Sequence, residues 1–277
     1  MCREKSFLSF LQTMVVVLLL HHHQACDATT NSDNQKFCPP SSCGKMRNIK
    51  HPFRLKNDPT NCGDPRYELS CENNITTLNL FWGKYYVKSI NYKNYTIRVV
   101  DPGIEEGDCS TIPRYFLTAT NFTSYYSYYE YKGDPYAFHD YSRPEHVVYL
   151  NCSKQLKNDP MYVDTSTCRL NSENNSYIYA IAGDFRVVKL NVGCRVKLVT
   201  MSSASAFISK KEFHAFPYVE IHRFLSYGFE LSWIRHPCED FCDMNQQNCY
   251  MNYNSGGLVC TVDYCTTPLG IDISCGK

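Results

Sequence analysis

Alternation of apolar and polar residues dominates the chain after Cys71. Residues 76–81, 85–91 and 95–100 each alternate or nearly alternate, and turn-forming residues separate them. Short runs rich in β-branched and aromatic residues, at intervals of about ten, predict an antiparallel meander. A second group of strands is predicted at 146–151, 177–182 and 185–198.

The same pattern predicts little helix. Residues 217–226 read as a helix because Pro217 stands at the start and Gly228 follows the end. This helix leads into a predicted strand at 229–234. Residues 112–141 are rich in tyrosine without a clear period, and we expect a connector there. The fold class is therefore mainly β and disulfide-rich, with two small antiparallel β domains.

The first 28 residues have the order of a secretory signal peptide. Arg3 and Lys5 precede an apolar run from Phe7 to Leu20, and small residues follow. The apolar run holds about 14 residues, fewer than the roughly 20 that a membrane-spanning helix needs. We expect a leader at 1–28, a flexible segment at 29–37 and a membrane anchor only as the weaker alternative. The histidines at 21–23 would leave with the leader.

The cysteines point to the same compartment. The chain has 16, and losing Cys2 and Cys26 with the leader leaves an even number. A secreted chain passes through an oxidising lumen, so we expect disulfides rather than a metal site, with their connectivity left open. The expected partners are Cys38, Cys43, Cys62, Cys71, Cys109, Cys152, Cys168, Cys194, Cys238, Cys242, Cys249, Cys260, Cys265 and Cys275.

Five acceptor sequences for N-glycosylation are also present. Each has the form Asn-X-Ser/Thr without proline, and each predicts a surface position in a secreted glycoprotein. Cys152, inside one of them, can be oxidised before the sugar is attached. The five acceptors are Asn74, Asn94, Asn121, Asn151 and Asn174.

A block of motifs between Cys38 and Cys109 is the most specific feature of the chain. It contains Cys43-Gly44, Pro52-Phe53, Cys62-Gly63 and Tyr67-Glu68-Leu69-Ser70-Cys71, with two of the predicted strands after them. The order and spacing of these elements resemble the galacturonan-binding domain of plant wall-associated receptor kinases. The most similar version is that of the leaf-rust-resistance type, which often has tyrosine where His51 stands here.

The remainder of the chain is similar to the cysteine-rich region that follows this domain in the same receptors. Residues 228–233 are followed by closely spaced cysteines and by Gly256-Gly257. The resemblance implies a receptor-like extracellular region that binds pectin. It extends over about 38–275 and includes no membrane span or kinase domain.

The charge distribution gives an independent reason to consider an acidic polysaccharide. The net charge is only +1, but residues 36–101 hold 11 Lys/Arg against 5 Asp/Glu. De-esterified pectin carries carboxylates that arginine can bind through two parallel hydrogen bonds. Exposed ion pairs are individually weak, at roughly 0–1 kcal/mol, so binding is expected to be multivalent and salt-sensitive. The candidate ligand-binding residues are Lys45, Arg47, Lys50, His51, Arg54 and Lys56.

Each candidate contact has a structural alternative. The cluster of cations reads equally well as a solvated loop face between cysteines. Trp82 and Trp233 could stack on sugar rings, but aromatic residues fill β cores more often, and we expect both to be buried. The tyrosine-rich stretch at 125–131 could serve either purpose.

Catalysis is not expected. The acidic groups at 105–108 and 239–240 read as exposed charge rather than as the spaced carboxylate pair of a glycosidase. No nucleophile elbow, zinc-protease helix or phosphate loop is present. The spacing of Cys238 and Cys242 does not fit a zinc finger. No cofactor is predicted.

The sequence thus predicts a secreted binding protein of the plant cell wall, with no enzyme activity. The predicted domains are a galacturonan-binding-like β domain at 38–109, a connector at 110–146 and a cysteine-rich β domain at 147–277. The expected partner is acidic pectin. The alternatives are a receptor-like decoy that binds a protein or peptide and, less favoured, a secreted glycoside hydrolase. No nucleic-acid partner is expected, and membrane attachment is expected only if the chain is part of a longer receptor.

Overall fold

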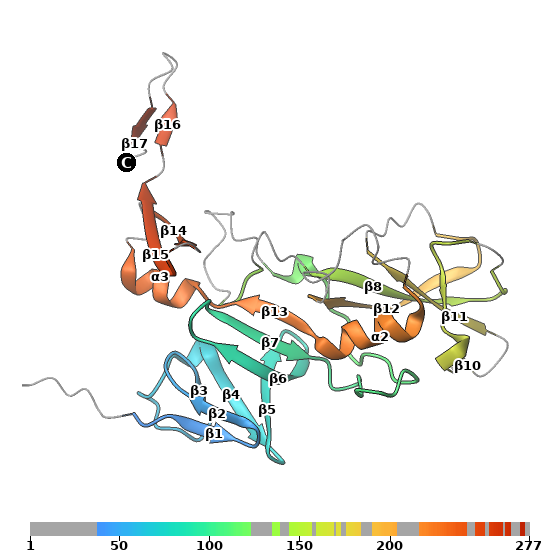
Figure 1. Cartoon of the computed structure of the whole chain (residues 1–277), viewed down its shortest axis with the longest axis horizontal. Coiled ribbons are helices and arrows are strands. Elements are labelled where there is room, and N and C mark those ends of the chain that lie inside the picture. The colour runs from blue at the N-terminus through green and yellow to red at the C-terminus, as the bar shows by residue number, and fades with distance from the viewer. Residues whose placement is uncertain are drawn as a thin grey trace, which may run out of the picture. The chain divides into compact units, whose positions relative to one another are not determined.

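The computed structural model describes residues 38–122, 135–138, 144–156, 159–168, 170–172, 176–183, 190–203, 216–242, 247–252, 255–262, 264–266 and 272–274. Small sheets with mainly antiparallel pairing dominate this part of the chain (Figure 1). The predicted fold class, mainly β and disulfide-rich with little helix, is confirmed. No helix in the described ranges is both long and apolar enough to cross a membrane.

The first half of the chain forms a hairpin and most of a six-stranded sheet. The hairpin pairs β1 (Ser41–Cys43) with β2 (Met46–Ile49). The sheet has the order β13-β7-β6-β5-β4-β3, antiparallel except for the parallel pair β3–β4. Its strands are β3 (Arg54–Leu55), β4 (Glu68–Glu72), β5 (Ile75–Leu80), β6 (Gly83–Asn91), β7 (Thr96–Val100) and β13 (Phe229–Ser232), with the short helix η1 (Pro65–Tyr67) before β4. The predicted meander and the strand after the helix are confirmed.

Strand β13 enters this sheet from far along the sequence. It pairs with β7 from Phe229 opposite Val99 to Ser232 opposite Thr96, and Figure 1 shows the orange strand beside the green one. Leu231 is fully buried in the same hydrophobic cluster as Leu69 and Ile97. The core beneath the first sheet is therefore built from both halves of the chain.

The second sheet has β8 at its centre. β8 (Glu145–Cys152) pairs with β11 (Ser176–Ala182) on one side and β12 (Cys194–Ser202) on the other. β9 (Val163–Asp164) and β10 (Asn171–Ser172) pair with β11, and the short helices η2 (Ala119–Asn121) and η4 (Ser166–Cys168) complete this part. Residues 147–150 are all buried, because clusters on both faces cover the central strand.

One predicted strand begins later than expected. We expected a strand over 185–198, but β12 starts at Cys194, and Val192 and Gly193 form a turn. Gly193 has φ +92°, a conformation that ends extended pairing and that glycine adopts without steric cost. Residues 185–189 of the predicted strand lie outside the described residues.

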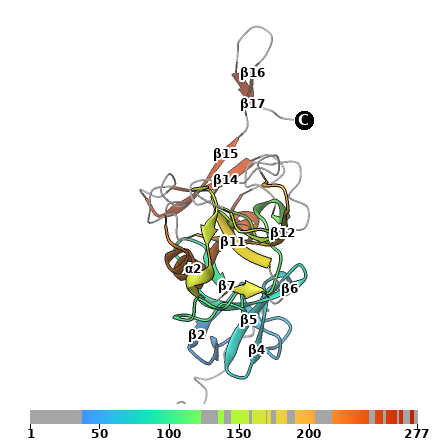
Figure 2. The ribbon, with the colours of Figure 1, turned by 90° about the vertical axis from the view of Figure 1, so that its right-hand side faces the viewer.

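Helix α2 (Tyr218–Tyr227) confirms the predicted helix. Pro217 precedes it, and Gly228 ends it with φ +86°. Ile221, Phe224 and Leu225 are buried in the core of the second sheet. The helix lies beside β7 and β12 (Figures 1 and 2).

Helix α3 (Arg235–Phe241) was not predicted. It has seven residues with a proline and a cysteine inside, too few for an apolar period to be visible. Two hairpins follow it in the chain: β14 (Gln247–Asn252) with β15 (Gly257–Val262), and β16 (Tyr264–Thr266) with β17 (Asp272–Ser274).

Twelve of the fourteen predicted cysteines form disulfides. The structure supplies the connectivity that the sequence left open: Cys38–Cys62, Cys43–Cys71, Cys109–Cys168, Cys152–Cys194, Cys238–Cys249 and Cys242–Cys260. Cys238 and Cys242, considered as zinc ligands, are thus disulfide-bonded. The side chains of Cys265 and Cys275 lie outside the described part of the chain.

The two tryptophans differ sharply in exposure. Trp233 is 3% exposed and packs edge-on against Phe53 and Tyr95, as predicted. Trp82 is 98% exposed at the β5–β6 turn, so its predicted burial is wrong. Of the tyrosine-rich stretch, residues 125–131 lie outside the described residues.

The predicted division at 110–146 stays a prediction. Links across it within the described residues include the pairing of β13 with β7 and the disulfide Cys109–Cys168.

Candidate ligand-binding surface

The motif block between Cys38 and Cys109 provides a packed aromatic core, which we call the support. Phe53 is 1% exposed and its ring meets those of Tyr67 and Trp233 edge-on, at centroid distances of 5.7 and 5.3 Å. Such edge-to-face aromatic pairs contribute about 0.5–1.5 kcal/mol each beyond their burial. The Pro-Phe and Tyr-Glu-Leu elements are therefore core residues of the support rather than ligand contacts.

Two glycines of these motifs allow close backbone approach. Gly44 ends β1 with φ +57°, and a Cβ there would collide with the carbonyl oxygen of Asn74. A Cβ on Gly63 would lie 2.8 Å from the side chain of Arg54. Each glycine lets a turn of the first segment lie directly against its neighbour.

Four predicted ligand-binding residues are exposed cations. Lys45, Arg47, Lys50 and Lys56 extend from the β1–β2 hairpin and the loops on either side of β3; we call these four the cationic hairpin. No carboxylate of the described residues forms an ion pair with any of them. Their charges are free to meet an anion from solution.

A tyrosine fixes the loop that carries Lys50. The Tyr92 hydroxyl accepts from the Lys50 backbone N–H at 2.9 Å and donates to the Lys50 carbonyl at 3.0 Å. The Lys50 ammonium lies 5.0 Å from the centroid of the same ring, within range of a cation–π contact. The adjacent turn residue Lys93 is also exposed, and the sequence reasoning did not include it. The sequence does not reveal that the β6–β7 turn contacts the hairpin, because the two segments are far apart along the chain.

Arg54 lies apart from this surface. It is 6% exposed, and its guanidinium donates to the Glu68 carboxylate and to the Asp58 carbonyl, each at 2.8 Å. These bonds fasten the 54–58 turn to β4. The placement favours a structural role for Arg54 over the predicted ligand contact.

His51 is exposed but faces helix α3. Its ring centroid lies 4.7 Å from that of His236, edge-on. Burial, with a further contribution from His51, lowers the pKa of His236. Of the predicted cluster, four cations are therefore exposed on the hairpin and the loops beside β3, whereas Arg54 is buried and His51 faces α3.

An ionic network joins η1 to α3 next to these histidines. Arg66 donates to both Asp64 and Glu239, and Glu239 also accepts from Arg235 at 2.7 Å. Burial alone would raise the pKa of Asp64, but hydrogen bonds from Arg66 outweigh burial and lower it. The hydrogen bond from Arg66 likewise lowers the pKa of Glu239. Glu239, predicted as exposed charge, is instead half-buried and paired.

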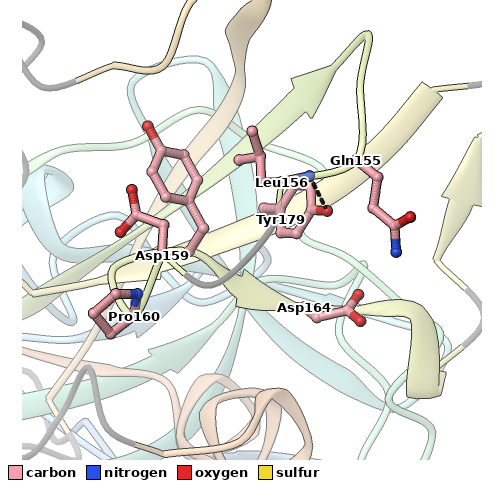
Figure 3. A pocket seen from close by; sticks show the side chains of 7 residues that line it. Gln155, Leu156, Asp159, Pro160, Asp164 and Tyr179 are labelled. Carbon is pink, nitrogen blue, oxygen red and sulfur yellow. Dashed lines mark hydrogen bonds between the residues drawn. The ribbon is translucent and has the colours of Figure 1, made fainter.

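A separate pocket of about 330 Å³ opens on the second sheet (Figure 3). Two carboxylates and two tyrosines line it with three other residues: Gln155, Leu156, Asp159, Pro160, Tyr162, Asp164 and Tyr179. The Tyr179 hydroxyl accepts from the Leu156 backbone N–H at 2.9 Å, which fixes one wall. Its carboxylates repel a polyanion and suit a cationic group.

The glycosylation acceptors occupy different environments. Asn74 is exposed in the β4–β5 turn, whereas Asn94 is half-buried and accepts from the Thr96 hydroxyl. The side chain of Asn121 accepts from the Thr118 backbone N–H. Asn151 lies in the central strand β8, next to the Cys152–Cys194 disulfide. Asn174 lies outside the described residues, and glycosylation itself stays a prediction.

Comparison with known proteins supports the resemblance noted from the motifs. Residues 38–101 match the family model described as wall-associated receptor kinase galacturonan-binding. This family is a binding domain of receptor extracellular regions, not a catalytic one. No solved structure matches the chain.

A curated relative extends the similarity beyond that domain. The chain is 27% identical over 216 residues to the leaf rust 10 disease-resistance locus receptor-like protein kinase-like 1.2 of Arabidopsis thaliana. The aligned region covers 73% of this chain and 29% of the relative, so the chain spans less than a third of that kinase. The similarity is to the extracellular region of a plant receptor-like kinase of this type.

Proposed function

We propose that the chain binds de-esterified pectin at the plant cell wall, through the cationic hairpin. The single observation that carries the proposal is the set of four unpaired cations on a disulfide-framed hairpin, within residues matched by the galacturonan-binding family. A polyuronide offers regularly spaced carboxylates to such a surface.

The energetics favour many weak contacts over one strong one. Each exposed ion pair contributes roughly 0–1 kcal/mol, and salt screens it with a Debye length of about 8 Å at physiological ionic strength. A polymer that meets several cations at once gains affinity by multivalency. Binding of this kind is modest in affinity and falls steeply with salt.

Retention on immobilised polygalacturonate tests the proposal. We expect retention at low salt that is lost as NaCl is raised. The triple substitution Lys45→Ala, Arg47→Ala and Lys50→Ala should weaken retention about tenfold or more, from roughly 0.5 kcal/mol or more per lost pair.

A matched control variant distinguishes loss of the proposed site from a general loss of positive charge. Lys154, Arg195 and Lys197 are exposed near and on β12, and changing them to alanine removes the same charge elsewhere. We expect near-normal retention for this control. Equal losses in both triple variants, or retention that ignores salt, would contradict binding by the cationic hairpin.

The acidic pocket favours a second candidate function, recognition of a protein or peptide. Its carboxylates Asp159 and Asp164 beside Tyr162 suit a lysine or arginine side chain of a partner. Crosslinking in cell-wall extracts, compared between the wild type and Asp159→Asn/Asp164→Asn, tests this. A peptide crosslink unaffected by the substitutions would exclude the pocket as its site.

A further inference from the structure

Two histidines and an aspartate meet between the first segment and helix α3. His51 stands between β2 and β3, whereas His236 and Asp240 lie one helical turn apart on α3. One ligand atom from each of the three lies within 4.8 Å of the others. The sequence predicted no metal site, because the partners are far apart along the chain.

The helix holds two of these side chains in register. Residues four apart share a helix face, and the His236 Nδ1 lies 3.8 Å from an Asp240 carboxylate oxygen. A tetrahedral zinc ion with metal–ligand bonds of about 2.0–2.1 Å needs ligand atoms about 3.3 Å apart. The distances between ligand atoms must therefore shorten by about 0.5 Å for His236 and Asp240, and by at most about 1.5 Å for any pair.

The two outer ligands are free to make that adjustment. His51 and Asp240 are both exposed, and neither makes a hydrogen bond within the described ranges. Side-chain rotation suffices, since both groups already face His236. The third ligand, His236, is by contrast only 8% exposed, and its ring packs edge-on against that of Tyr67.

The second ring nitrogen of His236 gives an independent observation, because it faces a carboxylate. The His236 Nε2 faces an Asp64 carboxylate oxygen at 3.8 Å. That carboxylate is itself held by Arg66 through bonds of 3.0 Å and 2.6 Å to one oxygen. Histidines that ligate metals through one nitrogen usually direct the other at a carboxylate or carbonyl, which fixes the tautomer and the ring. In His236 the second nitrogen faces such a carboxylate, at a distance 0.6 Å or more beyond a hydrogen bond, so a small shift of the ring would complete the arrangement when an ion binds.

We propose that His51, His236 and Asp240 bind one divalent transition-metal ion of the zinc class. Two imidazoles and one carboxylate suit zinc, nickel or copper, whereas calcium and magnesium prefer all-oxygen sites. Three protein ligands leave a fourth position open to water. The ion would join the loop after β2 to α3, and so stabilise the contact between the two halves of the chain.

Zinc titration of the full chain by calorimetry tests the proposal directly. All variants carry His21→Ala, His22→Ala and His23→Ala, which removes a second cluster of imidazoles from the N-terminal tract. We expect one zinc ion per chain in this background. Calcium and magnesium should not compete at equal concentration, and cobalt should give the visible absorption of a four-coordinate site.

Substitution of the exposed ligands assigns the ion to this site. His51→Ala should weaken zinc binding by about 100-fold or more, and Asp240→Asn by about tenfold or more. Asp64→Asn should weaken it by about 10–100-fold, as is typical for a carboxylate behind a ligating histidine. Glu106→Gln changes an exposed carboxylate elsewhere and should leave binding unchanged.

Folding is monitored by circular dichroism for each variant. Because His51 and Asp240 are exposed, both variants should retain the spectrum of the background chain. Zinc should raise the melting temperature of the background and not that of His51→Ala. Absence of zinc binding, a preference for calcium, or full binding by both His51→Ala and Asp240→Asn would overturn the proposal.

Discussion

At the scale of single residues, side chains of the same kind are buried at one position and exposed at another. Arg54 is buried against Glu68, whereas Lys50 is exposed on the same loop region. Trp233 fills the first core, whereas Trp82 is in solvent. Residue type alone predicts neither outcome, because burial depends on which neighbours the fold supplies.

The exposed tryptophan gives the first prediction. Because Trp82 is 98% exposed, Trp82→Ala should change the free energy of unfolding by no more than about 0.5 kcal/mol. Its flat ring is available to stack on a sugar face, so a few-fold loss of retention on polygalacturonate would extend the proposed surface from the cationic hairpin to the β5–β6 turn, and unchanged retention would confine the surface to the hairpin. Retention chromatography and urea unfolding measure the two effects. Phe241→Ala removes another exposed aromatic ring and serves as the control.

A buried histidine gives a prediction about pH. His222 is 2% exposed and its Nε2 lies 3.0 Å from the Thr111 hydroxyl oxygen. The same hydroxyl donates to the Asp108 carbonyl at 2.8 Å. Burial lowers the pKa of His222 below its ordinary value of 6.5, against a smaller opposing effect of Asp108.

The sign of the effect follows from proton binding. Below about pH 6.5 the unfolded chain takes up a proton that folded His222 takes up only at lower pH. The free energy of unfolding should therefore fall as pH falls through this window. His222→Gln should flatten the dependence measured by urea unfolding between pH 7.5 and 5.5. An unchanged slope would show that other groups cause it.

At the scale of elements, disulfides hold the hairpin in place where hydrogen bonds are few. The β1–β2 hairpin pairs with no other strand in the described sheets. Cys43–Cys71 joins it to β4, and the Thr76 hydroxyl donates to the Cys43 carbonyl. Cys43–Cys71 is therefore the disulfide that joins the hairpin directly to the first sheet, whereas Cys38–Cys62 anchors the segment before β1.

Removing that link is the element-scale prediction. In the chain-entropy model Cys43→Ala/Cys71→Ala should cost about 3–4 kcal/mol of stability. Retention on polygalacturonate should fall as well, because the hairpin loses its position. Cys152→Ala/Cys194→Ala lies in the second sheet and should lower stability without an equal loss of retention. Melting curves and retention at a temperature where both variants are folded separate these outcomes.

At the scale of the whole molecule, the first sheet depends on the second half of the chain. β13 supplies an edge strand to β7, and Phe229, Leu231 and Trp233 supply core side chains. Cys109–Cys168 and the Arg66–Glu239 pair add further links between the halves. Folding of residues 38–109 should therefore require residues beyond 109.

An isolated fragment tests this dependence. Residues 38–109 alone lack β13, and loss of three buried side chains, at several kcal/mol each, exceeds what a small domain can tolerate. We expect no cooperative thermal transition and poorly dispersed amide resonances for this fragment. Residues 38–277 should show a cooperative thermal transition and well-dispersed amide resonances. Cooperative folding of 38–109 would instead support the domain boundary predicted from the sequence.

The sequence by itself determined much of the local structure and predicted an anionic class of ligand. Period-2 alternation predicted β5, β6 and β7, and the proline and glycine around α2 set its ends, because these signals act between neighbours in the chain. The even cysteine count predicted disulfides, and the cluster of cations predicted an anionic ligand.

Only the tertiary structure decided which of the candidate residues are exposed and which are buried. It paired β13 with β7, buried Arg54 and exposed Trp82, and placed His51 against His236. It also selected the six described disulfides from many possible connectivities. These outcomes depend on contacts between residues far apart in the chain. No local pattern encodes them, since the free energy of burial is set by neighbours that only the folded chain brings together.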